Sequence, residues 1–478
     1  MMRHRGVGWL VAALALLAIP AAAGEAGGLA GVWEGTLDAD GAALRVVFTV
    51  SAADGGAYSA TLASPDQGAE GIQVREAVLD GRAVRFSVPA VLGQFDGELD
   101  DDGEHIAGVW TQAGRELPLA LERTAAGPVV VRPQDPPPMV SLYRSEMVTY
   151  QNAAAGITLG GTITTPNGDG PFPAVLLISG SGPQDRNETA YGHRPFLVLA
   201  DNLTKRGIAV LRVDDRGVGM SQGNVAQSTS RDLADDVRAG VEFLRTRPEI
   251  DARRIGLLGH SEGGLIAPMV AAETEDVAFV VMLGPPGIVG EEVLYDQARR
   301  ISEASGETPE GIERGRRLQE AVFEVLKSEP DNAAATERLR AVLKQGVAEL
   351  PEAAQAELAE SLDAFVDGQI RQVVTPWFRF FLAHDPAPAL EKVRCPVLAL
   401  FGGKDLQISP EANRAPLEAA LARGGNADHT VRTSDGVNHM FQTATTGLPS
   451  EYPKIPETIA PEVLGLIGDW ILERFGPK

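Results

Sequence analysis

Cysteine is almost absent from this sequence, in which Cys395 is the only example. A chain with one cysteine forms no internal disulfide, so its stability must come from core packing even in an oxidising compartment. Cys395 lies in the apolar stretch 393–400, where a buried and inert thiol is expected.

Positive charge is also scarce. Lys and Arg number 42 against 65 Asp and Glu, which gives a net charge of −23. Such acidity argues against nucleic acid and against anionic membrane surfaces as partners. We interpret it as the solvated surface of a soluble protein.

Long apolar runs are missing beyond the first twenty residues. Arg3 and Arg5 precede an apolar run at 7–19, and Ala21–Ala23 supplies an A-x-A site, a pattern typical of a cleaved signal peptide. The run is shorter than the ~20 residues of a membrane span, although an uncleaved anchor is the alternative. We expect a signal peptide at 1–23, a secreted or periplasmic protein, and no stable membrane insertion afterwards.

The 478 residues, 44 % of them hydrophobic, suggest two or three domains. Residues 28–124 alternate polar and apolar positions between turn signals, which predicts about eight short strands in a small all-β barrel or sandwich. The strands named by the pattern are 43–50, 58–63, 82–88, 93–99 and 105–112. A Pro-rich linker, 125–145, is expected to be extended and semi-rigid.

Residues 146–478 follow a different pattern. Continuous apolar runs fit strands that are buried on both faces of a sheet, and helical stretches such as 233–244 separate them. The runs are 174–178, 209–213, 255–258, 279–283 and 397–401. This alternation predicts an α/β fold with a doubly wound, mainly parallel sheet.

The alternation breaks at about 290–392, where helical patterns appear at 334–343 and 353–365. An insertion between two strands would form a helical cap over the carboxyl edge of the sheet. It ends in an aromatic cluster: Trp377, Phe378, Phe380 and Phe381. Trp377, Phe378 and Phe381 are candidates for a substrate pocket, and the core of the cap is the alternative.

A G-x-S-x-G pentapeptide occurs twice, around Ser261 and around Ser221. The motif places a serine on a tight turn between a strand and a helix, where neighbouring glycines relieve backbone crowding. Ser261 follows the apolar run 255–258 and precedes a helical stretch at 265–273, whereas Ser221 lies in a turn-rich loop. We therefore predict that Ser261 is the nucleophile.

A serine nucleophile needs a general base and an acid that orients it, in this fold in the order Ser, Asp or Glu, His. His439 lies in the loop after the strand pattern 429–433, while His429 belongs to that strand. Asp405 follows the strand 397–401 and is preferred to Asp435, which is only four positions from His439. His260 flanks the nucleophile, and we expect its side chain to point away from the site.

The oxyanion of an acyl-transfer reaction requires two backbone donors. The amide of Glu262, the residue after the nucleophile, is one candidate. The amide of Ser181, in the small-residue loop 179–183, is the other, with a plain turn as the alternative. This residue set requires no cofactor and no metal.

Several segments carry a family resemblance: SGSGPQDRNET, LRVDDRGVGMSQG, IGLLGHSEGGLIAP, FGGKD and VNHMF. They resemble secreted bacterial esterases of the α/β-hydrolase superfamily, near its serine-aminopeptidase-like and dienelactone-hydrolase-like branches. The N-terminal GVWEGTL is similar to the β-domain often fused to such enzymes. The resemblance covers about 146–478 and implies the triad Ser261, Asp405 and His439. It leaves the substrate open.

Cleavage of a small carboxylic ester is the function we expect. The alternatives are a serine peptidase or aminopeptidase, because the same triad acts on amides, an acyl-thioester hydrolase, and a binding module with a dead hydrolase domain. Export argues against the thioesterase, whose substrates are cytosolic, and a complete triad argues against the dead domain.

The signal pattern generates a first testable prediction. N-terminal sequencing of the protein from the secreted or periplasmic fraction should read from about Gly24, because the A-x-A site ends at Ala23. An intact Met1 on protein recovered from the cytoplasm would contradict the assignment.

Overall fold

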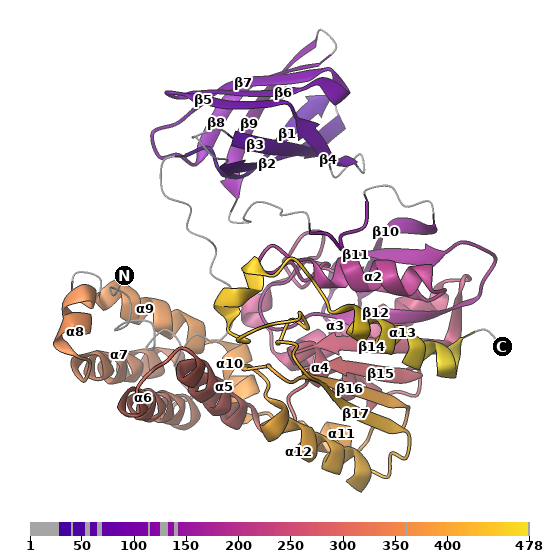
Figure 1. The fold of residues 1–478 in the computed structure, drawn as a ribbon, viewed down its shortest axis with the longest axis vertical. Coiled ribbons are helices and arrows are strands. Elements are labelled where there is room, and N and C mark those ends of the chain that lie inside the picture. The colour runs from indigo at the N-terminus through magenta and orange to yellow at the C-terminus, as the bar shows by residue number, and fades with distance from the viewer. Residues whose placement is uncertain are drawn as a thin grey trace. The chain divides into compact units, whose positions relative to one another are not determined.

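The computed structural model describes residues 28–39, 42–52, 58–64, 69–112, 115–124, 132–137, 142–359 and 362–476. The expected signal peptide, 1–23, lies outside these residues. The described chain groups into two compact units, one at 28–124 and the other comprising 132–136 and 142–476 (Figure 1). In this part of the chain, no helix combines the length and apolar character needed to cross a bilayer.

The first unit is an antiparallel sheet of nine strands, in the order β4-β3-β2-β1-β9-β8-β7-β6-β5. Contacts between β3 and β5 and between β4 and β6 bring its two edges together, so the sheet curls into a nearly closed barrel (Figure 1). The strands are β1 Gly31–Ala39, β2 Ala42–Ala52, β3 Tyr58–Ser64, β4 Ala69–Val74, β5 Glu76–Asp80, β6 Ala83–Val88, β7 Gly93–Leu99, β8 His105–Gln112 and β9 Arg115–Thr124.

Alternation along the strands fills the interior of the barrel. On β6, Val84, Phe86 and Val88 are buried while the residues between them are more exposed. Phe86 stacks on Phe48 with ring centroids 4.5 Å apart, and both side chains are fully buried. The period of two that predicted the strands therefore also forms this aromatic core.

The second unit contains an eight-stranded sheet in the order β10-β11-β13-β12-β14-β15-β16-β17. Strands β10 and β11 run antiparallel to their neighbours, and the pairs from β13 to β17 are parallel. The strands are β10 Tyr143–Asn152, β11 Ile157–Pro166, β12 Phe172–Ile178, β13 Ala209–Val213, β14 Ile250–His260, β15 Phe279–Leu283, β16 Val397–Gly402 and β17 His429–Ser434.

Helices cover both faces of this sheet. Val175 and Leu177 of β12 pack toward α2 and α13, while Leu176 packs toward α3, α4 and α12. Strands covered on both sides carry no polar alternation, which explains their continuous apolar runs. The helices are α2 Pro195–Lys205, α3 Ser230–Thr246, α4 Glu262–Ala271, α12 Pro410–Arg423 and α13 Pro461–Phe475.

The insertion between β15 and β16 is helical, as the sequence predicts, and Figure 1 shows α5 to α9 as a block beside the sheet. Its helices are α5 Gly290–Ala304, α6 Pro309–Ser328, α7 Asn332–Ala348, α8 Glu352–Leu358, α9 Leu362–Val373, α10 Pro376–Ala383 and α11 Ala387–Leu390. The helical pattern at 353–365 spans two helices, the end of α8 and the start of α9. The aromatic cluster lies on α10, whose first turn is capped by the Thr375 hydroxyl, which accepts from the Phe378 amide.

Part of the predicted linker is bound to the second unit. The Arg132 guanidinium donates hydrogen bonds to backbone carbonyls of 191–192 and of 453–455. The Gln134 side chain bonds the backbone at Thr458 and Ile459, and Asp135 pairs with Arg194 at 2.9 Å. The segment 132–136 is therefore an arm of the α/β unit, fixed before β10 begins at Tyr143.

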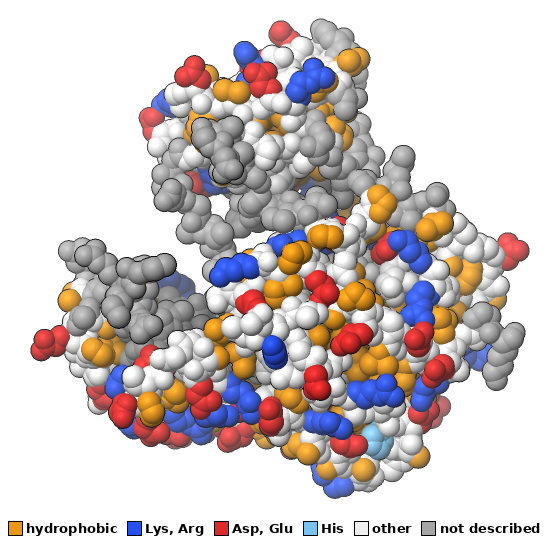
Figure 2. Space-filling model, in the orientation of Figure 1, with side chains coloured by type: hydrophobic (Ala, Val, Ile, Leu, Met, Phe, Trp, Pro, Cys, Tyr) orange, Lys and Arg blue, Asp and Glu red, His pale blue; other side chains and the backbone are white. Residues whose placement is uncertain are grey.

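Charged groups on the face seen in Figure 2 are interspersed in sign. Many pair across elements, as Arg247 does with Glu146 and Arg231 does with Glu273. Cys395, which precedes β16, is half-buried, and burial raises the pKa of its thiol to about 11.

Candidate active site

Ser261 lies on a sharp turn between β14 and α4. Its φ is 53° and its ψ is −116°, a conformation that residues other than glycine rarely adopt. A Cβ on Gly259 would lie 2.0 Å from the Gly263 carbonyl oxygen, and one on Gly263 would lie 2.1 Å from that of Ile178. The glycines of the motif are thus required because backbone segments meet there with no room for a side chain.

Asp405 and His439 form a buried pair at the same sheet edge. Asp405 follows β16 and His439 follows β17, and these strands run parallel to β14, which ends at the Ser261 turn. His439 Nδ1 lies 2.8 Å from Asp405 Oδ2, while Oδ1 accepts from the amides of Gln407 and Ile408. Because Nδ1 donates to the carboxylate, Nε2 of the neutral imidazole is left as a proton acceptor.

Gly284, directly after β15, leaves space for this pair. Its φ is +58°, and a Cβ there would lie 3.3 Å from Asp405 Oδ2 and 3.4 Å from His439 Nδ1. A side chain at this position would therefore press on the carboxylate and the imidazole together. No sequence signal identified Gly284.

The competing residues lie elsewhere. Asp435 is exposed in the turn after β17, and His429 begins β17 with its Nδ1 2.7 Å from the Asn426 carbonyl. The Ser221 hydroxyl donates to the Asp214 carbonyl at 2.6 Å and accepts from the Gly160 amide at 2.9 Å. Ser221 thus closes a loop.

The small-residue loop after β12 reaches the serine turn. A Cβ on Gly180 would lie 3.4 Å from Ser261 Cβ, so the loop backbone lies against the serine. The Gly180 amide donates a hydrogen bond to Glu188 Oε1 at 2.6 Å. Ser181, the predicted donor, is buried next to it, and the Glu262 amide is the first of α4 and has no acceptor within the helix.

The side chain of Glu262 links the turn to the insertion. Its Oε1 accepts from Trp377 Nε1 at 2.7 Å and from Ser230 Oγ at 2.6 Å. Glu262 is 1 % exposed, and this burial raises the pKa of its carboxyl. Trp377 of α10 thereby contacts the residue that follows Ser261, a contact that sequence reasoning missed.

The three predicted pocket residues differ in environment. Trp377 is partly exposed and stacks on Phe381, with ring centroids 5.2 Å apart. Phe378 is 1 % exposed and packs against Phe323 in the core of the insertion. A cavity of about 310 Å³ lies between α5 and α6, and its lining includes none of the triad candidates.

Glu188 and His260 form a second buried pair behind the serine turn. His260 Nδ1 lies 2.9 Å from Glu188 Oε1, and Nε2 lies 2.9 Å from the His439 carbonyl oxygen. Burial alone would lower the pKa of His260, but the Glu188 carboxylate and both hydrogen bonds outweigh burial and raise it. Sequence reasoning assigned no role to Glu188, because its partner His260 lies 72 positions away.

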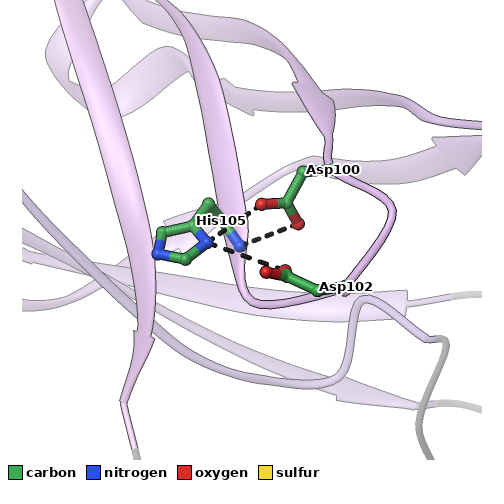
Figure 3. Close-up of side chains that lie close together, drawn as sticks. All are labelled: Asp100, Asp102 and His105. Carbon is green, nitrogen blue, oxygen red and sulfur yellow. Dashed lines mark hydrogen bonds and ion pairs between the residues drawn. The ribbon is translucent and has the colours of Figure 1, made fainter.

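One group in the described residues has ligand atoms spaced for a cation, namely Asp100, Asp102 and His105 at the turn between β7 and β8 (Figure 3). His105 Nδ1 lies 2.9 Å from Asp100 Oδ2, and this hydrogen bond raises the pKa of His105. The Asp100 carboxylate also accepts from the amides of Glu104 and His105. These bonds close the turn of the barrel unit, and the group shares no residue with the triad candidates.

Comparisons with known proteins agree with this architecture. A family model described as "Serine aminopeptidase, S33" matches residues 194–346. Esterase EstD of Thermotoga maritima is 29 % identical over 297 residues, or 62 % of this chain and 61 % of EstD, so the chain spans about three fifths of that relative. Esterase FrsA of Escherichia fergusonii is 30 % identical over 131 residues, covering 27 % of this chain and 29 % of FrsA.

Among solved structures, the esterase PF2001 of Pyrococcus furiosus covers 70 % of this chain and 92 % of its own, with a TM-score of 0.42 and 17 % identity. The strand order and the strained serine turn are those of the α/β-hydrolase fold. Over residues 194–346 the chain is similar to the family model described as "Serine aminopeptidase, S33".

Proposed function

We propose that this protein hydrolyses carboxylic esters through an acyl-enzyme intermediate on Ser261. The observation that carries the proposal is the 2.8 Å contact between His439 Nδ1 and Asp405 Oδ2. This pair follows strands that run parallel to β14, which ends at the Ser261 turn. An imidazole held in this tautomer presents Nε2 as a general base. The names of the relatives EstD and FrsA support esters as the substrates.

In the proposed mechanism, Ser261 Oγ attacks the ester carbonyl and its proton passes to His439 Nε2. Asp405 stabilises the imidazolium without taking a proton itself. The amides of Glu262 and Ser181 stabilise the oxyanion, and the partial positive charge at the start of α4 adds to their effect. His439 then protonates the departing alcohol. A water molecule, activated by the same base, releases the acid.

A peptidase is the second candidate, because the matched family model describes aminopeptidases. Hydrolysis of p-nitrophenyl esters of graded acyl length, measured beside aminoacyl p-nitroanilides, separates the two. We expect higher kcat/KM values for the esters. Anilide turnover above that of every ester would overturn the proposal.

Replacement of the two serines tests the nucleophile. Ser261→Ala should lower kcat by about 10⁴-fold or more with the fold intact, because the group that forms the acyl-enzyme is lost. Ser221→Ala is the matched control. It removes two buried hydrogen bonds, so it should lower the unfolding free energy by about 1–3 kcal/mol and leave kcat near wild type. A large loss of kcat in Ser221→Ala, with near wild-type kcat in Ser261→Ala, would contradict the assignment.

The acid is tested in the same way. Asp405→Asn should lower kcat on the order of 10⁴-fold, because an amide at this position favours the wrong imidazole tautomer. Asp435→Asn alters an exposed carboxylate near His439 and should leave kcat unchanged. If steady-state kinetics instead show the large loss of kcat in Asp435→Asn, Asp405 is not the acid of the triad.

Trp377 tests the role of the insertion in substrate choice. We expect Trp377→Ala to change the ratio of kcat/KM between short and medium acyl esters, since Trp377 contacts the residue after the proposed nucleophile. The change should be equivalent to about 1–3 kcal/mol in activation free energy. Phe323→Ala, in the core of the insertion, should cost about 3–5 kcal/mol of stability and preserve that ratio. A Trp377→Ala enzyme with a lower Tm and an unchanged acyl profile would assign Trp377 to packing.

A further inference from the structure

Both ring nitrogens of His260 have hydrogen-bond partners. A carbonyl oxygen only accepts hydrogen bonds, so Nε2, 2.9 Å from the His439 carbonyl oxygen, must carry a proton. Nδ1 faces Glu188 Oε1 at 2.9 Å, and a favourable contact there requires a second proton between the two atoms. The pair therefore holds one shared proton in addition to the one on Nε2.

This pair joins three parts of the candidate site. Glu188 Oε1 also accepts from the Gly180 amide, so it fixes the loop that carries Ser181. His260 is the last residue of β14 and directly precedes Ser261. Through its bond to the His439 carbonyl, His260 also holds the backbone of the proposed base, whose side chain is fixed by Asp405.

The surroundings of the pair are largely apolar. A small cavity beside it is lined by Glu188, His260 and seven residues of apolar character: Pro195, Phe196, Leu199, Leu283, Met440, Phe441 and Ile459. Asp405 also raises the pKa of His260, and the His439 ring lies beside it with its centroid 4.8 Å from that of His260. On the other side of the pair, the charge of Glu188 acts on Asp215. In such a setting, a shared proton contributes strongly to the contact, and its loss is correspondingly costly.

We propose that Glu188 and His260 are positioning residues, a buried pair with one shared proton that holds the Gly180–Ser181 loop and the His439 backbone in place around Ser261. The inference deepens the proposed ester hydrolysis and rests on it for its kinetic consequences. Neither side chain touches the reacting atoms; both act through the groups that do.

The sign of the pH effect follows from the direction of the pKa shift. The pKa of folded His260 is raised above its usual value, so the pair keeps its proton below the unfolded pKa and loses it as the pH rises through the folded one. Without the proton, an imidazole lone pair faces a carboxylate lone pair across 2.9 Å. The loop and the proposed base then lose their common support, so the pH profile of kcat should fall on its alkaline side.

The protonation state is measured without turnover. ¹⁵N NMR of histidine-labelled wild-type protein, with the His260 signals identified by their loss in His260→Gln, should show both ring nitrogens protonated at neutral pH. In Glu188→Gln, His260 should lose its second proton at lower pH, because the neutral amide no longer stabilises the cation. A neutral His260 in the wild type at pH 7 would overturn the proposal, whether or not esters are hydrolysed.

Kinetics test the positioning role. We expect Glu188→Gln to lower kcat by about 10–100-fold, to leave KM within about threefold, and to move the alkaline limb of kcat to lower pH, since small misplacements of catalytic groups cost about this much. The matched control is Asp236→Asn, which alters another buried carboxylate, one paired with Arg216 and Asn152 elsewhere in the unit. It should lower Tm and keep the wild-type pH profile.

A Glu188→Gln enzyme with a lower Tm but wild-type kcat and pH profile, measured well below that Tm, would assign the pair to stability and overturn the inference. If the wild type hydrolyses no ester, the proposed function fails instead, and the NMR titration still decides whether the shared proton exists.

Discussion

The backbone at Ser261 is held at a φ of 53°, and the arrangement of the whole site follows from that turn. Such a conformation costs on the order of 1–3 kcal/mol and persists only where its surroundings determine it. Here β14 enters between two parallel strands, α4 leaves immediately, and Gly263 packs against the end of β12. The contact with β12 also brings the loop after that strand to Ser261. One strained residue thus sets the positions of the candidate nucleophile, the helix N-terminus and the loop proposed to supply an oxyanion donor.

Burial of carboxylates is the second constraint on this region. Asp215, Glu188 and Glu262 surround the loop after β12; Glu188 and Glu262 are almost fully buried, and Asp215 is half-buried. Burial raises the pKa of Asp215 well above its usual value, and the nearby charges of Glu262 and Glu188 add to the effect. Hydrogen bonds from Ser179 Oγ and the Gln184 amide offset part of that cost. These hydrogen bonds tie the loop after β12 to Asp215.

Much of the α/β unit could be predicted from the sequence, because strands covered on both faces appear as uninterrupted apolar runs. The runs 209–213 and 279–283 coincide with β13 and β15. The barrel has nine strands where about eight were expected, since the short strands β4 and β5 follow one another with only Arg75 between them. The helical pattern at 353–365 divides between α8 and α9, because periodicity in an Ala- and Glu-rich stretch does not show where one helix ends and the next begins.

The candidate site shows a different limit. The sequence was enough to name three candidates, Ser261, Asp405 and His439, because each follows a recognisable strand. Parallel strands end at the same edge of a sheet, so these residues are expected to lie close together. Glu188 and Trp377 could not be found in this way. Their partners are 72 and 115 positions away, and a glutamate in a polar loop or a tryptophan in an amphipathic helix has an ordinary local interpretation. Long-range hydrogen bonds leave no local pattern in the sequence.

Cys395 has a chemical consequence of its own. With a thiol pKa of about 11, its thiolate amounts to only about one part in 10⁴ at neutral pH. Alkylating reagents, peroxides and mixed disulfides all react through the thiolate, so this side chain is slow toward each of them. A cysteine introduced on the surface would therefore react selectively, and the native thiol would not need to be removed first.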